Sequence, residues 1–151
     1  MFYSRGKDAW KRNQLSDAIE ELEKAVDSSE REPAMLKKLA LMYLKARNFP
    51  RSKDLLLEYI DKAPQDTESI YLASYATRKA GDYGISIDLG ERVRLRLPYY
   101  GENLLNLAKS HILLKNMDRA HSLLVEAQEI LTENQGIPKL IQFTERKLSK
   151  T

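Results

Sequence analysis

The sequence carries small residues at a spacing of 34 positions, and no other feature constrains its fold as strongly. One series of small residues consists of Gly6, Ala40, Ser74 and Ala108. A second series, twelve positions further on, consists of Ala18, Ser52, Ser86 and Ala120. Gly, Ala and Ser make up only 30 of the 151 residues, so composition alone does not account for small residues at all of these positions. A repeat of this length indicates one supersecondary unit that stacks on its neighbours to bury its apolar face.

Each repeat has the pattern of two short helices. Apolar residues between the Gly and Pro residues follow helical spacing, as at Leu36, Leu39 and Tyr43. No long stretch alternates between apolar and polar residues, and no Asn-Gly or Asp-Gly pair indicates a β-hairpin. Residues favoured as helix N-caps recur at Asn48, Asp82 and Asn116, with Gln14 in the corresponding place of the first repeat. The sequence therefore predicts an all-α chain of helix-turn-helix units.

This pattern resembles the tetratricopeptide repeat, a helix-turn-helix unit of 34 residues with small residues at its eighth and twentieth positions. The resemblance covers four repeats without insertions, at about residues 1–32, 33–66, 67–100 and 101–134. Gly90 departs from the pattern, because the family usually has a bulky residue at that place. The resemblance implies that residues 1–151 form a single domain, an α-solenoid of four repeats.

The segment after the fourth repeat predicts a C-terminal capping helix over about residues 137–150. One helix face carries Ile137, Leu140, Ile141, Thr144 and Leu148. Its other face is polar, which is what a terminal repeat needs to cover its apolar side. No such cap precedes Phe2, so we expect either a longer parent protein or a chain that begins inside the first helix.

No residue constellation in the sequence predicts catalysis. His111 takes the place that Tyr43 has in the second repeat, which favours a packing role, and His121 is expected near the surface. Asp118 and His121 lie at a possible ligand spacing, but two ligands do not make a metal site. There is no phosphate-binding Gly loop, nucleophile elbow or cysteine. We therefore predict no enzyme, no cofactor and no metal.

The sequence gives little information about location. No apolar run reaches the roughly 18 residues that a membrane span needs, and the first residues lack a signal-peptide pattern. No motif assigns a compartment, so the cytoplasm is only the default expectation.

The resemblance also implies a place for a ligand, because in that family the first helix of each repeat lines a concave groove. The implied peptide-binding residues are Lys37, Leu41, Lys45, Tyr71, Tyr75, Arg78, Leu105 and Lys109. Tyr71 and Tyr75 are four positions apart and share one helix face. Leu41 and Leu105 also fit a role in helix packing alone. An aromatic floor with a cationic rim suits an extended or helical segment of another protein with apolar anchors and acidic residues.

A subset of the family binds chaperone C-termini through a clamp of Lys, Asn and Arg residues. In one register the clamp positions here include Tyr3 and Glu68, and in the next they include Leu41 and Glu102. Neither register supplies the clamp, so chaperone-tail binding is not predicted.

Three functions stay open at this point. The first is a non-catalytic protein–protein interaction scaffold that binds a partner's segment in the groove. The second is a structural homo-oligomer that assembles through the uncapped first repeat. The third and weakest is single-stranded RNA binding through the Lys and Tyr side chains. Nucleic acid is disfavoured because the net charge is only +3 and the four repeats carry −2, +3, +1 and −2, so no continuous basic stripe exists.

Overall fold

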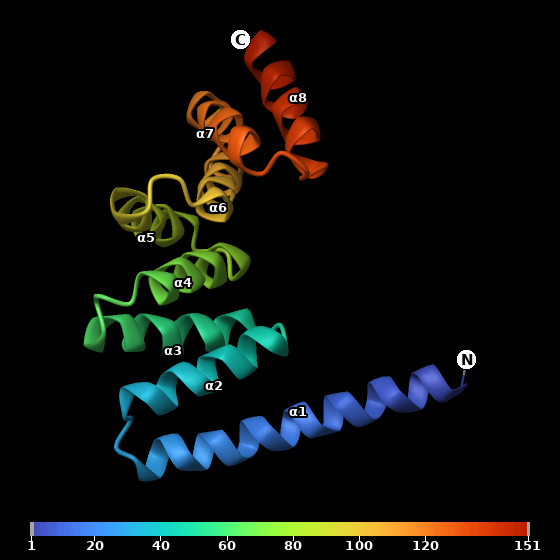
Figure 1. Ribbon diagram of the computed structural model, residues 1–151, viewed down its shortest axis with the longest axis vertical. Helices are drawn as coiled ribbons and strands as arrows, with labels where there is room; N and C mark the ends of the chain where they lie inside the picture. The colour runs from blue at the N-terminus through green and yellow to red at the C-terminus, as the bar shows by residue number, and fades with distance from the viewer. Residues whose placement is uncertain (1, 151) are drawn as a thin grey trace. The chain divides into compact units, whose positions relative to one another are not determined.

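The computed structural model describes the backbone of residues 2–150 and the side chains of residues 11–150. Over these residues the chain forms eight α-helices and no strand, as the helical periodicity predicts (Figure 1). The contacts divide the chain into two compact units, Met1–Gln65 and Asp66–Thr151. That residues 1–151 act as a single domain stays a prediction.

The first unit contains α1 (Phe2–Ser28), α2 (Pro33–Lys45) and α3 (Phe49–Lys62). Asn48 is the N-cap of α3, and its Oδ1 accepts a hydrogen bond of 3.2 Å from the backbone N–H of Arg51. The core between α2 and α3 is fully buried at Leu36, Leu39 and Leu56. These residues recur at helical spacing, so the hydrophobic effect holds the two helices face to face.

Helix α1 is tied to α2 and α3 by polar contacts as well as by its buried Val26. The carboxylate of Glu23 accepts hydrogen bonds from the hydroxyl of Tyr43 and, at 2.9 Å, from the guanidinium of Arg51. These contacts involve only the C-terminal half of the helix. Figure 1 shows the N-terminal half of α1 continuing straight past the ends of α2 and α3.

The first repeat differs from the sequence prediction of two helices joined by a turn. In the other repeats the turn passes through a positive φ at positions 34 apart: Arg47 (59°), Gly81 (94°) and Lys115 (64°). The corresponding Asn13 lies inside the single helix α1. The physical difference lies in the residue type that follows: it is Gln14 here, whereas the other three repeats have Asn or Asp, which favour the non-helical backbone at a helix start even where the side chain makes no cap bond.

The second unit contains five helices, which match the third and fourth predicted repeats and the capping helix. Their bounds are α4 (Thr67–Lys79), α5 (Tyr83–Arg96), α6 (Gly101–Leu113), α7 (Met117–Ile130) and α8 (Gly136–Ser149). Small residues lie where the paired helices touch, since Ser74, Ser86, Ala108 and Ala120 are all fully buried. Ser74 and Ser86 exchange hydrogen bonds through Oγ and backbone O, at 2.7 and 2.8 Å. Small side chains therefore allow close approach, and the serines remain hydrogen-bonded where they are buried.

Gly90 of α5 leaves space for the side chain of Leu107 on α6. A Cβ at this position would lie 2.6 Å from Cδ2 of Leu107, whose side chain is fully buried. The corresponding residues of the second and fourth repeats are Leu56 and Leu124. Leu107 therefore occupies space that a larger side chain at position 90 would need.

Helix α8 covers the fourth repeat as predicted for a capping helix. Ile137 and Thr144 are fully buried, and Leu140 and Ile141 pack against the core of α6 and α7. His111 is 9% exposed, in keeping with its predicted packing role, and His121 lies within 3.4 Å of Glu145 on α8. In the described part of the chain no helix is both long and apolar enough to cross a membrane.

Candidate ligand-binding pocket

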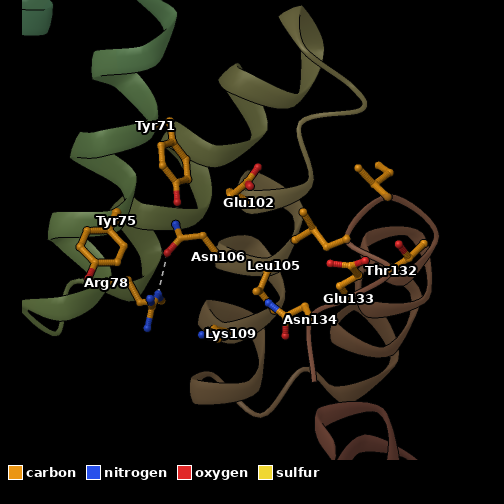
Figure 2. A pocket seen from close by; sticks show the side chains of 12 residues that line it. Tyr71, Tyr75, Arg78, Glu102, Leu105, Asn106, Lys109, Thr132, Glu133 and Asn134 are labelled. Carbon is orange, nitrogen blue, oxygen red and sulfur yellow. Dashed lines mark hydrogen bonds between the residues drawn. The ribbon is translucent and has the colours of Figure 1, made fainter. Parts of the chain in front are cut away.

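A pocket of about 430 Å³ opens on the second unit, between α4, α6 and the segment that follows α7 (Figure 2). Five residues predicted from the sequence line it together: Tyr71, Tyr75, Arg78, Leu105 and Lys109. They come together because Tyr71, Tyr75 and Arg78 follow one another on one face of α4, as Leu105 and Lys109 do on α6.

Tyr71 forms an aromatic wall of the pocket. Its ring lies 4.9 Å from the ring of Tyr100, tilted by 55°, in the range of a favourable aromatic pair. Burial, and then the nearby Tyr100 and Glu102, raises the pKa of Tyr71 to about 12. The phenol is therefore protonated at neutral pH and can donate a hydrogen bond to a ligand.

Arg78 is held in place by a buried amide. Its Nε donates a hydrogen bond of 2.6 Å to Oδ1 of Asn106, drawn as a dashed line in Figure 2. The Nδ2 of Asn106 in turn donates to the Oγ of buried Ser74, at 2.9 Å. The guanidinium carbon also lies 5.5 Å from the centre of the Tyr75 ring, within cation–π distance. The Arg78 head group is thus oriented on both sides.

Lys109 lies close to two other cations. Burial lowers the pKa of its amine below the usual value, and Arg78 and Lys79 lower it further by like-charge repulsion. Burial likewise lowers the pKa of Arg78, which remains charged. Among the described residues no carboxylate forms an ion pair with Arg78 or Lys109. Within the described chain, this side of the pocket therefore holds two cations that lack a counter-ion.

The remaining lining has a different character. Figure 2 shows Glu102 and Glu133 away from Arg78 and Lys109, which makes the pocket bipolar. Ile130 and Leu131, at the end of α7, add apolar surface beside Leu105. Such a pocket offers an apolar contact flanked by a cationic side and an acidic side.

The sequence analysis missed seven of the lining residues. They are Glu102, Asn106, Ile130, Leu131, Thr132, Glu133 and Asn134. Asn106 could have been found as a polar residue at a buried helix position. No sequence feature indicated residues 131–134, because their position depends on how the chain turns from α7 into α8.

The other three predicted residues lie on α2 in the first unit. Nζ of Lys37 is 5.8 Å from the centre of the Tyr59 ring, and Leu41 is 37% exposed. Lys45 lines a separate hollow beside Leu15 and Met42. Their role in ligand binding stays a prediction.

The described residues contain no group of three or more His, Cys, Asp or Glu side chains placed to hold a metal ion. The polar groups of the pocket are instead suited to binding by charge and hydrogen bonds.

Comparison with known proteins identifies relatives in structure alone. No protein-family model matches the chain, and neither does any curated protein sequence. The solved structure of MamA MSR-1 C2 matches with a TM-score of 0.80 and 18% identity, over 97% of this chain and 84% of that one. A MamA structure from Desulfovibrio magneticus RS-1 matches with a TM-score of 0.82 and 12% identity, over 95% and 81%. The first TPR of Spaghetti (RPAP3), bound to the HSP90 peptide SRMEEVD, matches with a TM-score of 0.72 and 12% identity, over 79% of this chain and 94% of that one.

Proposed function

We propose that this chain, which has the fold of a tetratricopeptide-repeat α-solenoid, is a non-catalytic interaction module that binds a segment of a partner protein in the pocket of the second unit. The observation that carries the proposal is the pair of cations, Arg78 and Lys109, which have no carboxylate partner among the described residues. The fold supports it, since a solved structure of similar fold holds an acidic peptide of HSP90.

The ligand chemistry follows from the pocket. A carboxylate of the partner, from Asp, Glu or a C-terminus, supplies the negative counter-charge for Arg78 and Lys109. Hydrogen bonds between charged groups contribute about 1.5–3 kcal/mol each, and more specificity when the donor is pre-oriented, as Arg78 is by Asn106. An apolar side chain next to the carboxylate packs on Leu105 and Leu131. We expect a short peptide to bind with a dissociation constant on the order of micromolar, about −8 kcal/mol.

Peptide selection tests this proposal with ligands of random sequence. A random peptide display library is selected against the parent protein and against Lys109→Glu. The matched control is Lys139→Glu, the same charge change on the exposed side of α8. Circular dichroism first establishes equal helix content in all three proteins.

The parent and Lys139→Glu are expected to select the same peptides, with an acidic residue beside an apolar one. Lys109→Glu is expected to lose them, with at least a tenfold weaker affinity for each synthesised peptide, equivalent to about 1.4 kcal/mol. Equal selection by Lys109→Glu and the parent would show that the ligand binds elsewhere. Charge reversal at Lys37 and Lys45 is assayed in parallel, which tests their predicted contacts independently.

A further inference from the structure

The first unit has a groove where each of the other repeats has a helix. The groove measures about 480 Å³ and lies between α1 and α2. It is lined by Gln14, Leu15, Ala18 and Met42, together with the cationic Lys11, Arg12 and Lys45. In the later repeats the first helix of the pair covers the corresponding face of the second, as α2 does for α3. In the first repeat the two predicted helices are merged into α1, so the face of residues 15–28 has no such cover within its own repeat.

Exposure at equivalent positions shows the difference. Ser52, Ser86 and Ala120 are fully buried, whereas Ala18 is partly exposed. One turn further along the helix the same contrast recurs, since Leu56 and Leu124 are fully buried and Leu22 is partly exposed. Among the described residues, the second half of α1 therefore keeps an apolar helix-packing face that its packing against α2 covers only in part.

The segment that fits this groove is present in the sequence. Residues 2–13 carry most of the first-helix pattern, with Phe2 and Gly6 at the positions of Leu36 and Ala40, although Arg5 stands where the second repeat has Leu39. In the second repeat those two residues are fully buried, on the helix that pairs with α3. Lys11 and Arg12 already line the groove of their own chain, whereas residues 2–10 cannot fold back onto it while α1 is straight, because they continue the same helix away from it.

We propose that residues 2–13 of α1 occupy this groove in a second copy of the chain, which gives a reciprocally exchanged dimer. The two helices of a helix-turn-helix unit run antiparallel. When the turn is straight, two copies can pack their α1 helices antiparallel about a two-fold axis near Gln14. Residues 2–13 of each copy then pair with residues 15–28 of the other. The two halves match in length, since 12 residues span about 18 Å and 14 residues about 21 Å. The exchange does not rest on the proposed ligand, whose pocket lies in the other unit.

Residues 13 and 14, which stand where the other repeats have a turn, decide whether the helix pair forms within one chain or between two copies. A closed hairpin and an exchanged dimer contain the same helix–helix contacts, so the turn decides between them. At the third repeat the turn is Gly81–Asp82, a residue suited to a positive φ followed by a favoured N-cap. At the first repeat it is Asn13–Gln14, and Gln is a poor N-cap. The straight helix is therefore favoured here.

The experiment measures the mass of the full chain by light scattering over a wide concentration range. The parent is expected to approach twice the 17.4 kDa of one chain. The double variant Asn13→Gly/Gln14→Asp installs the turn of the third repeat, and it is expected to be mostly monomeric with unchanged helix content.

Cysteine cross-linking locates the contact, because the chain has no cysteine of its own. Gln14→Cys lies at the predicted two-fold axis and is expected to form a disulfide between copies on oxidation. The matched control is Ser16→Cys, on the exposed opposite side of α1, and it is expected to remain unlinked.

Two results would overturn the exchange. The first is a parent protein whose mass stays at 17.4 kDa at every concentration, because such a chain does not dimerise. The second is a dimer that persists in the turn variant and cross-links equally at positions 14 and 16, because such a dimer uses another surface. Loss of the dimer in the turn variant together with selective linking at position 14 supports the proposal.

Discussion

Replacing Gly90 by Ala tests the packing between α5 and α6 most directly when it is combined with Leu107→Ala. The new Cβ would lie 2.6 Å from Cδ2 and 2.8 Å from Cγ of Leu107, both closer than carbon atoms approach without displacement. Leu107 is fully buried, so any shift of its side chain takes place inside a packed core. Removing that side chain leaves room for the Cβ. The effect of Gly90→Ala should therefore depend on what stands at position 107.

The magnitudes follow from three contributions. Overpacking a close-packed core costs about 1–3 kcal/mol, and Ala in place of a mid-helix Gly gains about 1 kcal/mol. In the parent, Gly90→Ala is therefore expected to destabilise by about 0–2 kcal/mol. Leu107→Ala alone should cost about 2–5 kcal/mol through the lost burial and the cavity. In that background Gly90→Ala loses its clash and keeps its helical gain, so it should stabilise by about 1 kcal/mol or more.

Urea unfolding of the four proteins, followed by circular dichroism, gives the four free energies of this cycle. The expected coupling is about 1–3 kcal/mol, with a change in the sign of the Gly90→Ala effect between the two backgrounds. Additivity within about 0.5 kcal/mol would refute the argument, because it would mean that position 90 does not contact Leu107. An unchanged m-value confirms that the unfolding transition is the same in all four proteins.

Three further predictions concern stability. Burial, and then the charge of Arg119, lowers the pKa of His111 below 6.5, so the unfolded chain binds more protons than the folded chain as pH falls through that value, and stability drops. In urea unfolding at neutral and acidic pH, His111→Gln should therefore lose less stability on acidification than the parent. Ile137→Ala should destabilise by about 2–5 kcal/mol in thermal unfolding, since this fully buried side chain anchors α8, and a loss below about 1 kcal/mol would contradict that role. The two hydrogen bonds of 2.6 Å from Arg31 hold the pKa of Glu58 below 4.5, so their contribution to stability is present above pH 4.5 and is lost as pH falls through the lowered pKa. The Arg31 side chain is 43% exposed, so Glu58→Gln should cost less than about 1 kcal/mol of stability at neutral pH.

The fold was predictable because its signal is distributed over the chain. The small-residue series located the helix pairs of the last three repeats, and the N-cap residues Asn48, Asp82 and Asn116 directly precede α3, α5 and α7. Only Asn48 among them accepts a side-chain cap bond from the following helix. The amide of Asn116 instead lies 3.3 Å from Nδ1 of His111. The position of these residues in the repeat therefore predicted where the helices begin, although only one of the three expected cap hydrogen bonds is formed.

The candidate pocket was predictable only for the residues that lie on the first helix of a repeat. Helical spacing brings Tyr71, Tyr75 and Arg78 to one face, and this can be read from the sequence alone. The hydrogen bond from Arg78 to Asn106 joins two helices across 28 positions, and it depends on the depth at which α4 and α6 pack. Nothing local encodes that depth, since it is set by small residues such as Ser74 between the helices.

The first repeat separates two kinds of information that the other repeats carry together. The series of apolar and small residues specifies which helix faces pair. That series is present at Phe2, Gly6, Leu15 and Ala18, and it is interrupted at Arg5, where the second repeat has Leu39. The turn specifies whether the pair forms within one chain, and it depends on two residues, Asn13 and Gln14. A periodic pattern is satisfied equally by contacts within a chain and by contacts between chains, because the buried surface is the same in both. Where the turn residues are weak, the repeat pattern therefore predicts the contact but not its connectivity, and α1 is where the two diverge.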